Sequence, residues 1–397
     1  MSKRTVIVGA SAAGVSTAEA LQRLEPSREI ILVGDESTLA HDRPPLSKQV
    51  LEGTWTPDQA QLLPPARREA LRAELLLGKR AAGVDIRARR LSIDDGTQLS
   101  YDDLVIATGV RPRELHAPRP NGVHVLRTIS ECQALRAHLT EAKGGPLVIV
   151  GGGFIGLEVA ATARKLGIAV TLVEPAPQAL GRRIGAQAAS RLMERHREQE
   201  VQFRLGTGVS GFAADSHGKV TAVLLADGSA LEARVVLVAI GCVPNVEWLA
   251  GSGLDISDGV VCDEYCRAAP GVWAAGDVAR WRHLASDRHM RIEHRLNATE
   301  QGSAVAANII GPLQPYLPTP FFWTDQYAVK LQLAGTVSPD AEETVEHQGG
   351  DSYLHTYRAD GRLVAVLGWN AARAMMPLRK ELGIAARAVQ PPAPVAA

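Results

Sequence analysis

The pattern of apolar and polar positions predicts a strand–helix–strand unit in the middle of the chain. Leu147 to Val150 form a continuous apolar run, which is typical of a buried parallel strand. A helix-forming run extends from Leu157 to Leu166, and Gly167 ends it. A second apolar run, Val170 to Val173, predicts another strand, and Glu174 stands at its end. This order predicts two strands of a parallel sheet joined by a helix.

The turn between the first strand and the helix carries the motif G-x-G-x-x-G. Gly151 makes the turn, Gly153 lets a pyrophosphate approach the backbone, and Gly156 allows the helix to pack closely on the strand. The helix N-terminus offers free N–H groups and a positive dipole end to phosphates. Glu174, at the tip of the second strand, can accept hydrogen bonds from an adenosine ribose. The unit therefore predicts a dinucleotide site.

A second unit of the same kind opens the chain. Thr5 to Val8 predict a strand, Gly9 to Gly14 (GASAAG) the turn, Val15 to Leu24 a helix, and Glu29 to Val33 the next strand. The middle glycine of the motif is replaced by Ser11, which is small enough to let a phosphate approach. Two such units predict two bound dinucleotides. They need not both be nicotinamide nucleotides, because a flavin dinucleotide uses the same turn.

Other stretches predict loops, a helix and antiparallel strands. The prolines of HDRPPLSK, residues 41–48, predict an extended loop that leads into a helix. Residues 65–76 predict a polar helix, and residues 201–236 a hairpin-rich insert with turns at His-Gly and Asp-Gly. Residues 321–369 alternate in the manner of an antiparallel sheet. The final eight residues, QPPAPVAA, predict a disordered tail.

Charge and composition exclude some partners. The 43 Lys and Arg residues balance 43 Asp and Glu residues, so the formal net charge is zero. This balance gives no indication of binding to nucleic acid or to a membrane surface. No apolar run reaches the ~18 residues of a membrane-spanning helix, and the first residues lack the apolar segment of a secretory signal. We therefore expect a cytoplasmic protein with neither kind of partner.

The chain contains four scattered cysteines: Cys132, Cys242, Cys262 and Cys266. Three residues separate the last two, which is not the C-x-x-C spacing of a redox dithiol or a zinc site. We expect reduced, structural thiols and no metal site.

With these pieces in order, the chain resembles the FAD-dependent NADH:ferredoxin reductases, of the putidaredoxin-reductase and aromatic-dioxygenase ferredoxin-reductase type. The resemblance extends from roughly residue 4 to residue 370. It rests on short motifs in the family order: GASAAG, VGDE, RPPLSK, IATG, LRT, GGGFIGLEVA, GCVPN, AAGD, RIE…NATEQG and FWTDQY.

The resemblance implies a glutathione-reductase-like α/β architecture with two Rossmann-like domains and a C-terminal α+β interface domain. Residues 1–112 and 246–320 would form an FAD-binding domain, split around an NAD-binding domain of residues 113–245. Residues 321–397 would form the interface domain with the disordered tail. The implied cofactors are FAD and NAD. The implied partner is a [2Fe–2S] ferredoxin that serves a cytochrome P450 or Rieske-type oxygenase, and the chain would be a monomer or weak homodimer.

The resemblance also implies a set of FAD contacts. It places the pyrophosphate at Gly9, Ala13 and Gly14, the adenosine ribose at Asp35 or Glu36, and the adenine at the backbone of Ala82. It places Arg43 and Lys48 against the flavin or its phosphates, with Lys48 near flavin N5, and it places Arg127 beside the cofactor. Asp277 would bind a ribitol hydroxyl, and the backbone N–H of Arg295 would face the pyrimidine end. Only the backbone role carries over at this last position, because the family commonly has a small apolar residue there.

A second set of contacts is implied for NADH and for the electron acceptor. The turn at Gly153, Phe154, Ile155 and Gly156 would hold the nucleotide, with Glu158 at the nicotinamide carboxamide, Glu174 at the ribose, Arg182 beside the adenosine and Gly241 near the nicotinamide. Trp323 would lie beside the isoalloxazine, at the face where ferredoxin docks. Arg379 and Lys380 are candidate basic contacts at this face from their charge alone, without a match to the family, and ordinary surface charges are the alternative.

The residues around Glu174 predict NADH as the donor in preference to NADPH. A 2′-phosphate at this position would meet a carboxylate of like charge. Residues 175–177, PAP, follow and offer no cation. Arg182 and Arg183 lie further on and are the residues that could weaken the repulsion.

Two other functions stay open on the same scaffold. One is a dithiol reductase or NADH oxidase, but the segment Arg43 to Lys48 lacks the cysteines that dithiol relatives place there. The other is a flavin-bearing redox sensor or interaction protein of the apoptosis-inducing-factor type. Negligible ferredoxin reduction, with a long-lived complex of reduced flavin and NAD⁺, would indicate the sensor.

Overall fold

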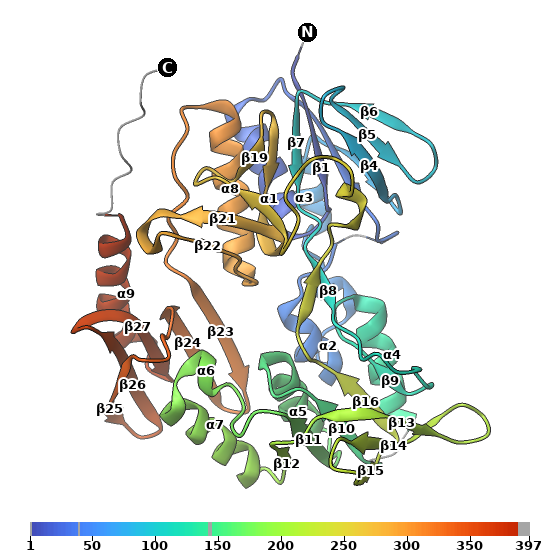
Figure 1. Cartoon of the computed structure of the whole chain (residues 1–397), viewed down its shortest axis with the longest axis vertical. Coiled ribbons are helices and arrows are strands. Elements are labelled where there is room, and N and C mark those ends of the chain that lie inside the picture. Colours follow the sequence, from blue (N-terminus) through green and yellow to red (C-terminus); the bar gives the residue numbers. More distant parts are fainter. Residues whose placement is uncertain (1, 39, 142–144, 388–397) are drawn as a thin grey trace.

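The computed structural model describes residues 2–38, 40–141 and 145–387 (Figure 1). Its first sheet has six strands in the order β19-β20-β7-β1-β2-β3, and every pair is parallel except β19 with β20. The strands are β1 (Arg4–Val8), β2 (Glu29–Gly34), β3 (Glu74–Leu77), β7 (Asp103–Ile106), β19 (Arg267–Ala269) and β20 (Val272–Ala274). The sheet therefore combines two segments that lie far apart in the sequence.

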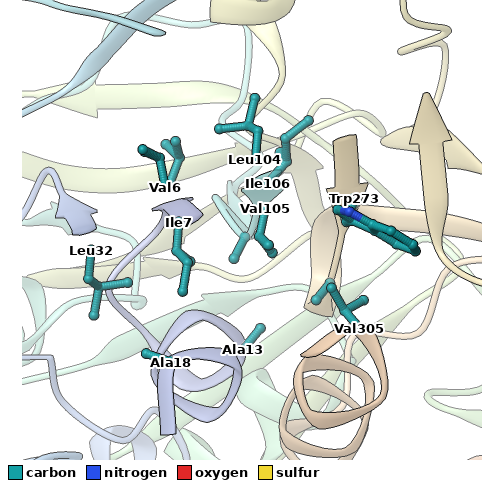
Figure 2. Close-up of a cluster of buried hydrophobic side chains, with 14 of the residues drawn as sticks. Val6, Ile7, Ala13, Ala18, Leu32, Leu104, Val105, Ile106, Trp273 and Val305 are labelled. Atoms are coloured by element: carbon teal, nitrogen blue, oxygen red, sulfur yellow. The ribbon is translucent and has the colours of Figure 1, made fainter. Parts of the chain in front are cut away.

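Two helices cover one face of this sheet, α1 (Ala12–Leu24) and α8 (Arg295–Ile310) (Figure 2). They approach closely because small residues meet at their contact. A Cβ on Gly302 would lie 2.5 Å from the carbonyl oxygen of Ala13. The hydroxyl of Thr17 donates to that same oxygen at 2.8 Å. The apolar runs of the sequence fill the sheet centre, where Ile7 and Val105 are fully buried.

The second parallel sheet has five strands in the order β12-β11-β10-β16-β9 and lies in the lower half of Figure 1. Its strands are β9 (Val123–His124), β10 (Leu147–Val150), β11 (Val170–Glu174), β12 (Gln202–Leu205) and β16 (Val235–Val238). Helices α4 (Ile129–Glu141), α5 (Phe154–Lys165), α6 (Gly181–Ile184) and α7 (Ala186–Glu198) belong to this part, as does a small antiparallel sheet of β13 (Val209–Ala214), β14 (Val220–Leu225) and β15 (Ala230–Glu232).

The two parallel sheets are connected by β8 (Val110–Pro112) and β17 (Cys242–Pro244), which pair with each other in antiparallel fashion (Figure 1). Two small sheets border the first: β4 (Ala81–Asp85), β5 (Arg90–Ile93) and β6 (Gln98–Ser100), and β18 (Val260–Cys262), β21 (Ala279–His283) and β22 (Arg288–Met290). The short helices are η1 (Pro44–Ser47), α2 (Gln49–Glu52), η2 (Pro57–Ala60), α3 (Pro65–Ala70), η3 (Glu247–Leu249), η4 (Gly276–Val278) and η5 (Leu284–Ser286).

The C-terminal part is a five-stranded antiparallel sheet followed by one helix. Its strands run in the order β23 (Phe321–Gln326), β24 (Val329–Gly335), β27 (Arg362–Trp369), β26 (Ser352–Ala359) and β25 (Glu342–Gly349), and α9 (Ala372–Arg387) packs on β24 and β27. Strand β23 contacts both α5 and α8. It therefore touches α5, which joins two strands of the second parallel sheet, and α8, which covers the first.

Two predictions of local structure were wrong. Residues 41–48 are not an extended loop, because both prolines lie in η1, whose backbone angles proline adopts readily. The polar helix predicted over residues 65–76 ends at Ala70, and Glu74–Leu77 instead pair in parallel with β2. Pairing with an existing sheet edge outweighed the local helical preference.

A third prediction was partly wrong. The hairpin-rich insert was placed at residues 201–236, but its outer segments are β12 and β16 of the parallel sheet. Only residues 209–232 form the antiparallel hairpins, with the turns at the predicted dipeptides. The sequence did not predict α9. The predicted disordered tail lies outside the described residues. No helix in the described ranges is long and apolar enough to cross a membrane.

Candidate active site

The turn between β1 and α1 has the geometry that a pyrophosphate requires. Gly9 has φ +121°, and a Cβ on it would lie 2.1 Å from the carbonyl oxygen of Ala107. A Cβ on Gly14 would lie 2.0 Å from the carbonyl oxygen of Gly9. A side chain is therefore excluded at both positions, and the backbone packs closely at the N-terminus of α1. Ser11 is the N-cap, and no acidic residue in the first turn competes with a bound anion.

The turn between β10 and α5 repeats this geometry. Gly151 has φ +110°, and a Cβ on it would lie 2.3 Å from the carbonyl oxygen of Ala239. A Cβ on Gly156 would lie 2.2 Å from the carbonyl oxygen of Gly151. Gly153 differs, because the nearest atom to a Cβ there lies 4.0 Å away. Gly151 and Gly156 are needed for packing inside the protein, whereas Gly153 faces open space that a ligand can enter.

Helix α5 begins at Phe154, one turn earlier than the sequence predicted. The glycine turn is thus shorter, with Gly153 as the N-cap of the helix. The ring of Phe154 packs against Phe322 of β23 at 4.5 Å between centroids, while Ile155 is exposed. The first residue of α5 therefore packs against the C-terminal sheet.

Glu174 is fixed at the end of β11 by the backbone. Its Oε2 accepts a hydrogen bond from the N–H of Gly152 at 2.7 Å, and its Oε1 accepts one from Ala176 at 2.9 Å. The carboxylate is half-buried and lies beside the glycine turn. A carboxylate has about four lone-pair positions, so acceptor sites are left for ribose hydroxyls.

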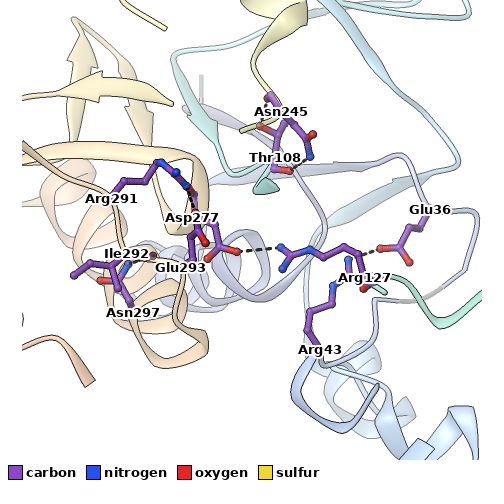
Figure 3. A network of polar contacts seen from close by, with 10 residues as sticks. All are labelled: Glu36, Arg43, Thr108, Arg127, Asn245, Asp277, Arg291, Ile292, Glu293 and Asn297. Carbon is purple, nitrogen blue, oxygen red and sulfur yellow. Dashed lines mark hydrogen bonds and ion pairs between the residues drawn. The ribbon is translucent and has the colours of Figure 1, made fainter. Parts of the chain in front are cut away.

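Four residues predicted for FAD form one connected polar network (Figure 3). Glu36 pairs with Arg43 at 2.6 Å, and Arg43 Nη1 also donates to the backbone oxygen of Arg127 at 2.6 Å. The Arg127 guanidinium in turn pairs with Asp277 at 3.0 Å. The structure thus brings together residues from three segments: Glu36 and Arg43 between β2 and η1, Arg127 between β9 and α4, and Asp277 in η4 after β20.

The sequence assigned no role to several residues that shape this network. Gln301 Oε1 accepts the N–H of Gly276 at 2.9 Å, and Asn297 Nδ2 donates to the backbone of Ile292. Glu131 accepts the N–H of Arg127 at 2.8 Å. Gln301 and Asn297 lie within the motif RIE…NATEQG, so the motif was recognised but the contacts were not predictable from it.

Arg295 is the first residue of α8, and its side chain has partners of its own. The guanidinium Nε pairs with Asp42 at 2.5 Å, and Nη1 donates to Thr299. The preceding His294 is largely buried, and burial lowers its pKa to about 4, so the ring is neutral at neutral pH. Its ring contacts Phe322 at 5.2 Å between centroids.

Lys48 and Glu158, both predicted as catalytic, form a direct ion pair of 2.7 Å. Glu158 is buried on α5 and also accepts hydrogen bonds from the hydroxyls of Ser47 and Thr324, the latter at 2.7 Å. The pair forms because η1 and α2, which follow β2 of the first sheet, pack against α4 and α5 of the second. Leu46 is buried in that contact.

The remaining predicted residues lie at more open positions. Asp35 and Arg182 are exposed, Ala82 is exposed beside a β-bulge in β4, and Trp323 is 36% exposed on β23, with Ala13 buried under the first turn. Gly241 has φ +97°, and a Cβ on it would meet no atom within 4 Å. Of the two acids proposed for the adenosine ribose, only Glu36 belongs to the polar network.

Comparison with known proteins identifies two family matches. Residues 3–302 match the family described as pyridine nucleotide-disulphide oxidoreductase, and residues 321–396 match the reductase C-terminal family. The chain is 37% identical, over 93% of its length and 91% of the relative's, to the ferredoxin–NAD(+) reductase component of an anthranilate 1,2-dioxygenase system from Burkholderia cepacia. It is 38% identical to putidaredoxin reductase from Pseudomonas putida, over 83% of this chain and 79% of that protein.

Solved structures agree with these matches. The covalent putidaredoxin reductase–putidaredoxin complex matches with a TM-score of 0.91 and 34% identity, over 96% of this chain and 93% of that chain. The ferredoxin reductase for the CYP199A2 system from Rhodopseudomonas palustris matches with a TM-score of 0.92 and 33% identity, over 96% and 95%. The predicted fold class is confirmed. With its two glycine turns, its C-terminal sheet and these relatives, the chain belongs to the pyridine nucleotide-disulphide oxidoreductase family, in the ferredoxin-reductase branch that the sequence resemblance indicated.

Proposed function

We propose that this chain is an NADH-dependent flavoprotein that passes electrons through FAD to a [2Fe–2S] ferredoxin, which serves a cytochrome P450 or Rieske-type oxygenase. The ferredoxin-reductase part of this function, with its cofactors and partner class, is confirmed at the level of the family. The observation that carries the proposal is the Lys48–Glu158 ion pair, which joins the two glycine-turn units. The segment Arg43 to Lys48, which supplies the lysine, contains no cysteine.

The first glycine turn and the polar network fit FAD. The N-terminus of α1 would hold the pyrophosphate, Glu36 the adenosine ribose, and Asp277 a ribitol hydroxyl. In the present structure Arg43 and Arg127 neutralise these two acids. When bound, FAD supplies the exchange between a two-electron donor and a one-electron acceptor.

The second turn fits the pyridine nucleotide. Gly153 leaves open space at the N-terminus of α5 for a pyrophosphate, and Glu174 offers acceptor positions to the adenosine ribose. Glu158 would meet the nicotinamide carboxamide, and Gly241 would lie near the nicotinamide. Lys48 would bring its ammonium group to the place where the nicotinamide and the flavin meet.

The thiols do not fit an electron route. All four cysteines are free, and three of them are buried. Burial raises the pKa of the Cys132 and Cys266 thiols to about 12, so they stay protonated and unreactive at neutral pH. We therefore assign the exit of electrons to the flavin edge beside Trp323, which is exposed on β23 with its ring centroid 6.4 Å from that of Phe321.

The chain division at residues 112, 245 and 320 stays part of this proposal, as do cytoplasmic location and a monomer or weak homodimer. Free cysteines support a cytoplasmic location, because disulfides are rare there.

The test of the proposed function is reduction of candidate ferredoxins from the same genome by NADH, with purified, yellow protein. Rapid reduction of one ferredoxin supports the proposal. Flavin reduction by NADH with negligible transfer to every ferredoxin would instead favour the redox sensor.

A further inference from the structure

A chain of buried polar side chains continues from Glu158 away from the proposed nicotinamide position. Phe322, Thr324 and Gln326 alternate along β23 and face α5 and α7, whereas Trp323 lies on the opposite face of the strand. Thr324 and Gln326 are 1% exposed, and His196 of α7 is fully buried. Buried polar groups at these positions need an explanation, because apolar side chains would pack there without cost.

Four hydrogen bonds link these side chains in series, from Glu158 to Tyr327. The Thr324 hydroxyl lies 2.7 Å from Glu158 Oε1, and Gln326 Nε2 lies 3.1 Å from Thr324 Oγ1. His196 Nε2 lies 2.7 Å from Gln326 Oε1, and the Tyr327 hydroxyl lies 3.0 Å from His196 Nδ1.

The charge of Glu158 sets the direction of every bond. A carboxylate only accepts, so the single hydroxyl proton of Thr324 points to Glu158. Thr324 Oγ1 is then free only to accept, so Gln326 must turn its amide nitrogen toward it. The Gln326 carbonyl oxygen consequently faces His196, which must carry its proton on Nε2. Nδ1 is left as an acceptor for the Tyr327 hydroxyl.

His196 and Tyr327, which lie farthest from Glu158 in this series, are held in the protonation states that these bond directions require. Burial lowers the pKa of His196 to about 4, so the ring carries one proton at neutral pH. Burial also raises the pKa of Tyr327, so its hydroxyl remains a donor. The chain therefore presents only donors toward Glu158, and Ser47 and Lys48 donate to its other oxygen.

We propose that Thr324, Gln326 and His196 are positioning residues that hold Glu158 as an oriented carboxylate acceptor. The inference rests on the proposed function in placing Glu158 at the nicotinamide carboxamide. Because Thr324 adjoins Trp323 on β23, the same strand orients Glu158 on one face and presents the proposed ferredoxin contact on the other. This series of hydrogen bonds does not conduct protons, because the Gln326 amide in its middle cannot pass a proton on without becoming an imidic acid.

Removing the charge of Glu158 should change the state of His196, which is three hydrogen bonds away. In Glu158→Gln the amide nitrogen can face Thr324 while the oxygen keeps Lys48 and Ser47. Thr324 would then donate to Gln326, the Gln326 amide would turn around, and His196 would carry its proton on Nδ1. The variant should therefore change the tautomer of His196 from Nε2–H to Nδ1–H.

Nitrogen-15 NMR of the full-length, FAD-loaded protein labelled at histidine distinguishes the two tautomers, and His196→Asn assigns the signal. We expect Nε2–H in the unmodified protein and in Thr324→Ser, which keeps the hydroxyl. We expect Nδ1–H in Glu158→Gln and a mixture in Thr324→Val, where Gln326 loses its acceptor. An unchanged tautomer in both Glu158→Gln and Thr324→Val would overturn the proposal. If Glu158→Gln does not fold, the two Thr324 variants still decide.

A kinetic comparison tests the positioning role. At saturating NADH, flavin reduction by Thr324→Val should be about tenfold slower, because a misplaced carboxamide contact costs orientation. Thr324→Ser should stay within about twofold of the unmodified protein. Equal rates for the two variants would contradict the positioning role. The NMR result needs no turnover, so failure of the unmodified protein to reduce any ferredoxin would refute the proposed function while leaving the tautomer result intact.

Discussion

Replacing Glu174 by glutamine should remove most of the preference for NADH over NADPH. The carboxylate is held by the N–H groups of Gly152 and Ala176 on its two oxygens, at 2.7 and 2.9 Å. A side chain pinned in this way cannot swing away from a 2′-phosphate. The repulsion is therefore built into the turn. Glutamine keeps the volume and removes the charge, although its amide nitrogen must face one of the two backbone donors.

The size of the effect follows from the charge clash and one hydrogen bond. Two unit charges 4 Å apart interact by about 4 kcal/mol at the effective dielectric constant of a protein surface. Partial exposure of Glu174 reduces this to about 2 kcal/mol. The hydrogen bond from a ribose 2′-hydroxyl to the carboxylate adds about 1 kcal/mol. The sum of about 3 kcal/mol corresponds to a preference for NADH of about 100-fold in kcat/KM.

The assay is steady-state kinetics with NADH and NADPH, with ferricyanide as the acceptor so that ferredoxin docking does not contribute. The variant should raise KM for NADH and leave kcat nearly unchanged, because the ribose contact is equal in ground and transition states. Glu194→Gln, at an exposed position on α7, is the matched control. Equal use of both nucleotides by the unmodified protein would refute the reasoning and assign control of the pocket to Arg182 and Arg183.

Three further predictions concern FAD, the thiols and the docking face. Asp277→Ala should weaken FAD binding by about 1–3 kcal/mol, because a ribitol contact and the partner of Arg127 are lost; an unchanged flavin dissociation constant by ultrafiltration would contradict this. Replacing all four cysteines by serine should leave NADH-dependent ferredoxin reduction within about threefold, because burial keeps the thiols protonated. Loss of that activity with FAD still bound would point to a thiol route. Trp323→Ala should lower kcat/KM for ferredoxin about tenfold and leave ferricyanide reduction unchanged; equal losses with both acceptors would exclude a docking role.

The local parts of the fold and site were predictable from the sequence alone. Both glycine turns, the strands that precede them and the acid at the end of β11 follow from short-range geometry: a buried strand reads as an apolar run, and a turn that excludes Cβ atoms requires glycine. The antiparallel C-terminal sheet was likewise visible as alternation over residues 321–369. Where local propensity was the only guide, as at residues 65–76, it failed against strand pairing.

Only the tertiary structure decided which side chains meet. Lys48 and Glu158 are 110 residues apart, and they pair because the apolar residues of η1 and α2 pack onto helices of the other sheet. Glu158 and Thr324 are 166 residues apart, and the register of β23 places that hydroxyl on the carboxylate. Such contacts are set by how apolar faces of distant elements fit together, and this fit leaves no periodic signal near either residue. The residue types of the site were therefore legible in the sequence, whereas its charge pairs and hydrogen-bond directions arose only when the chain was packed.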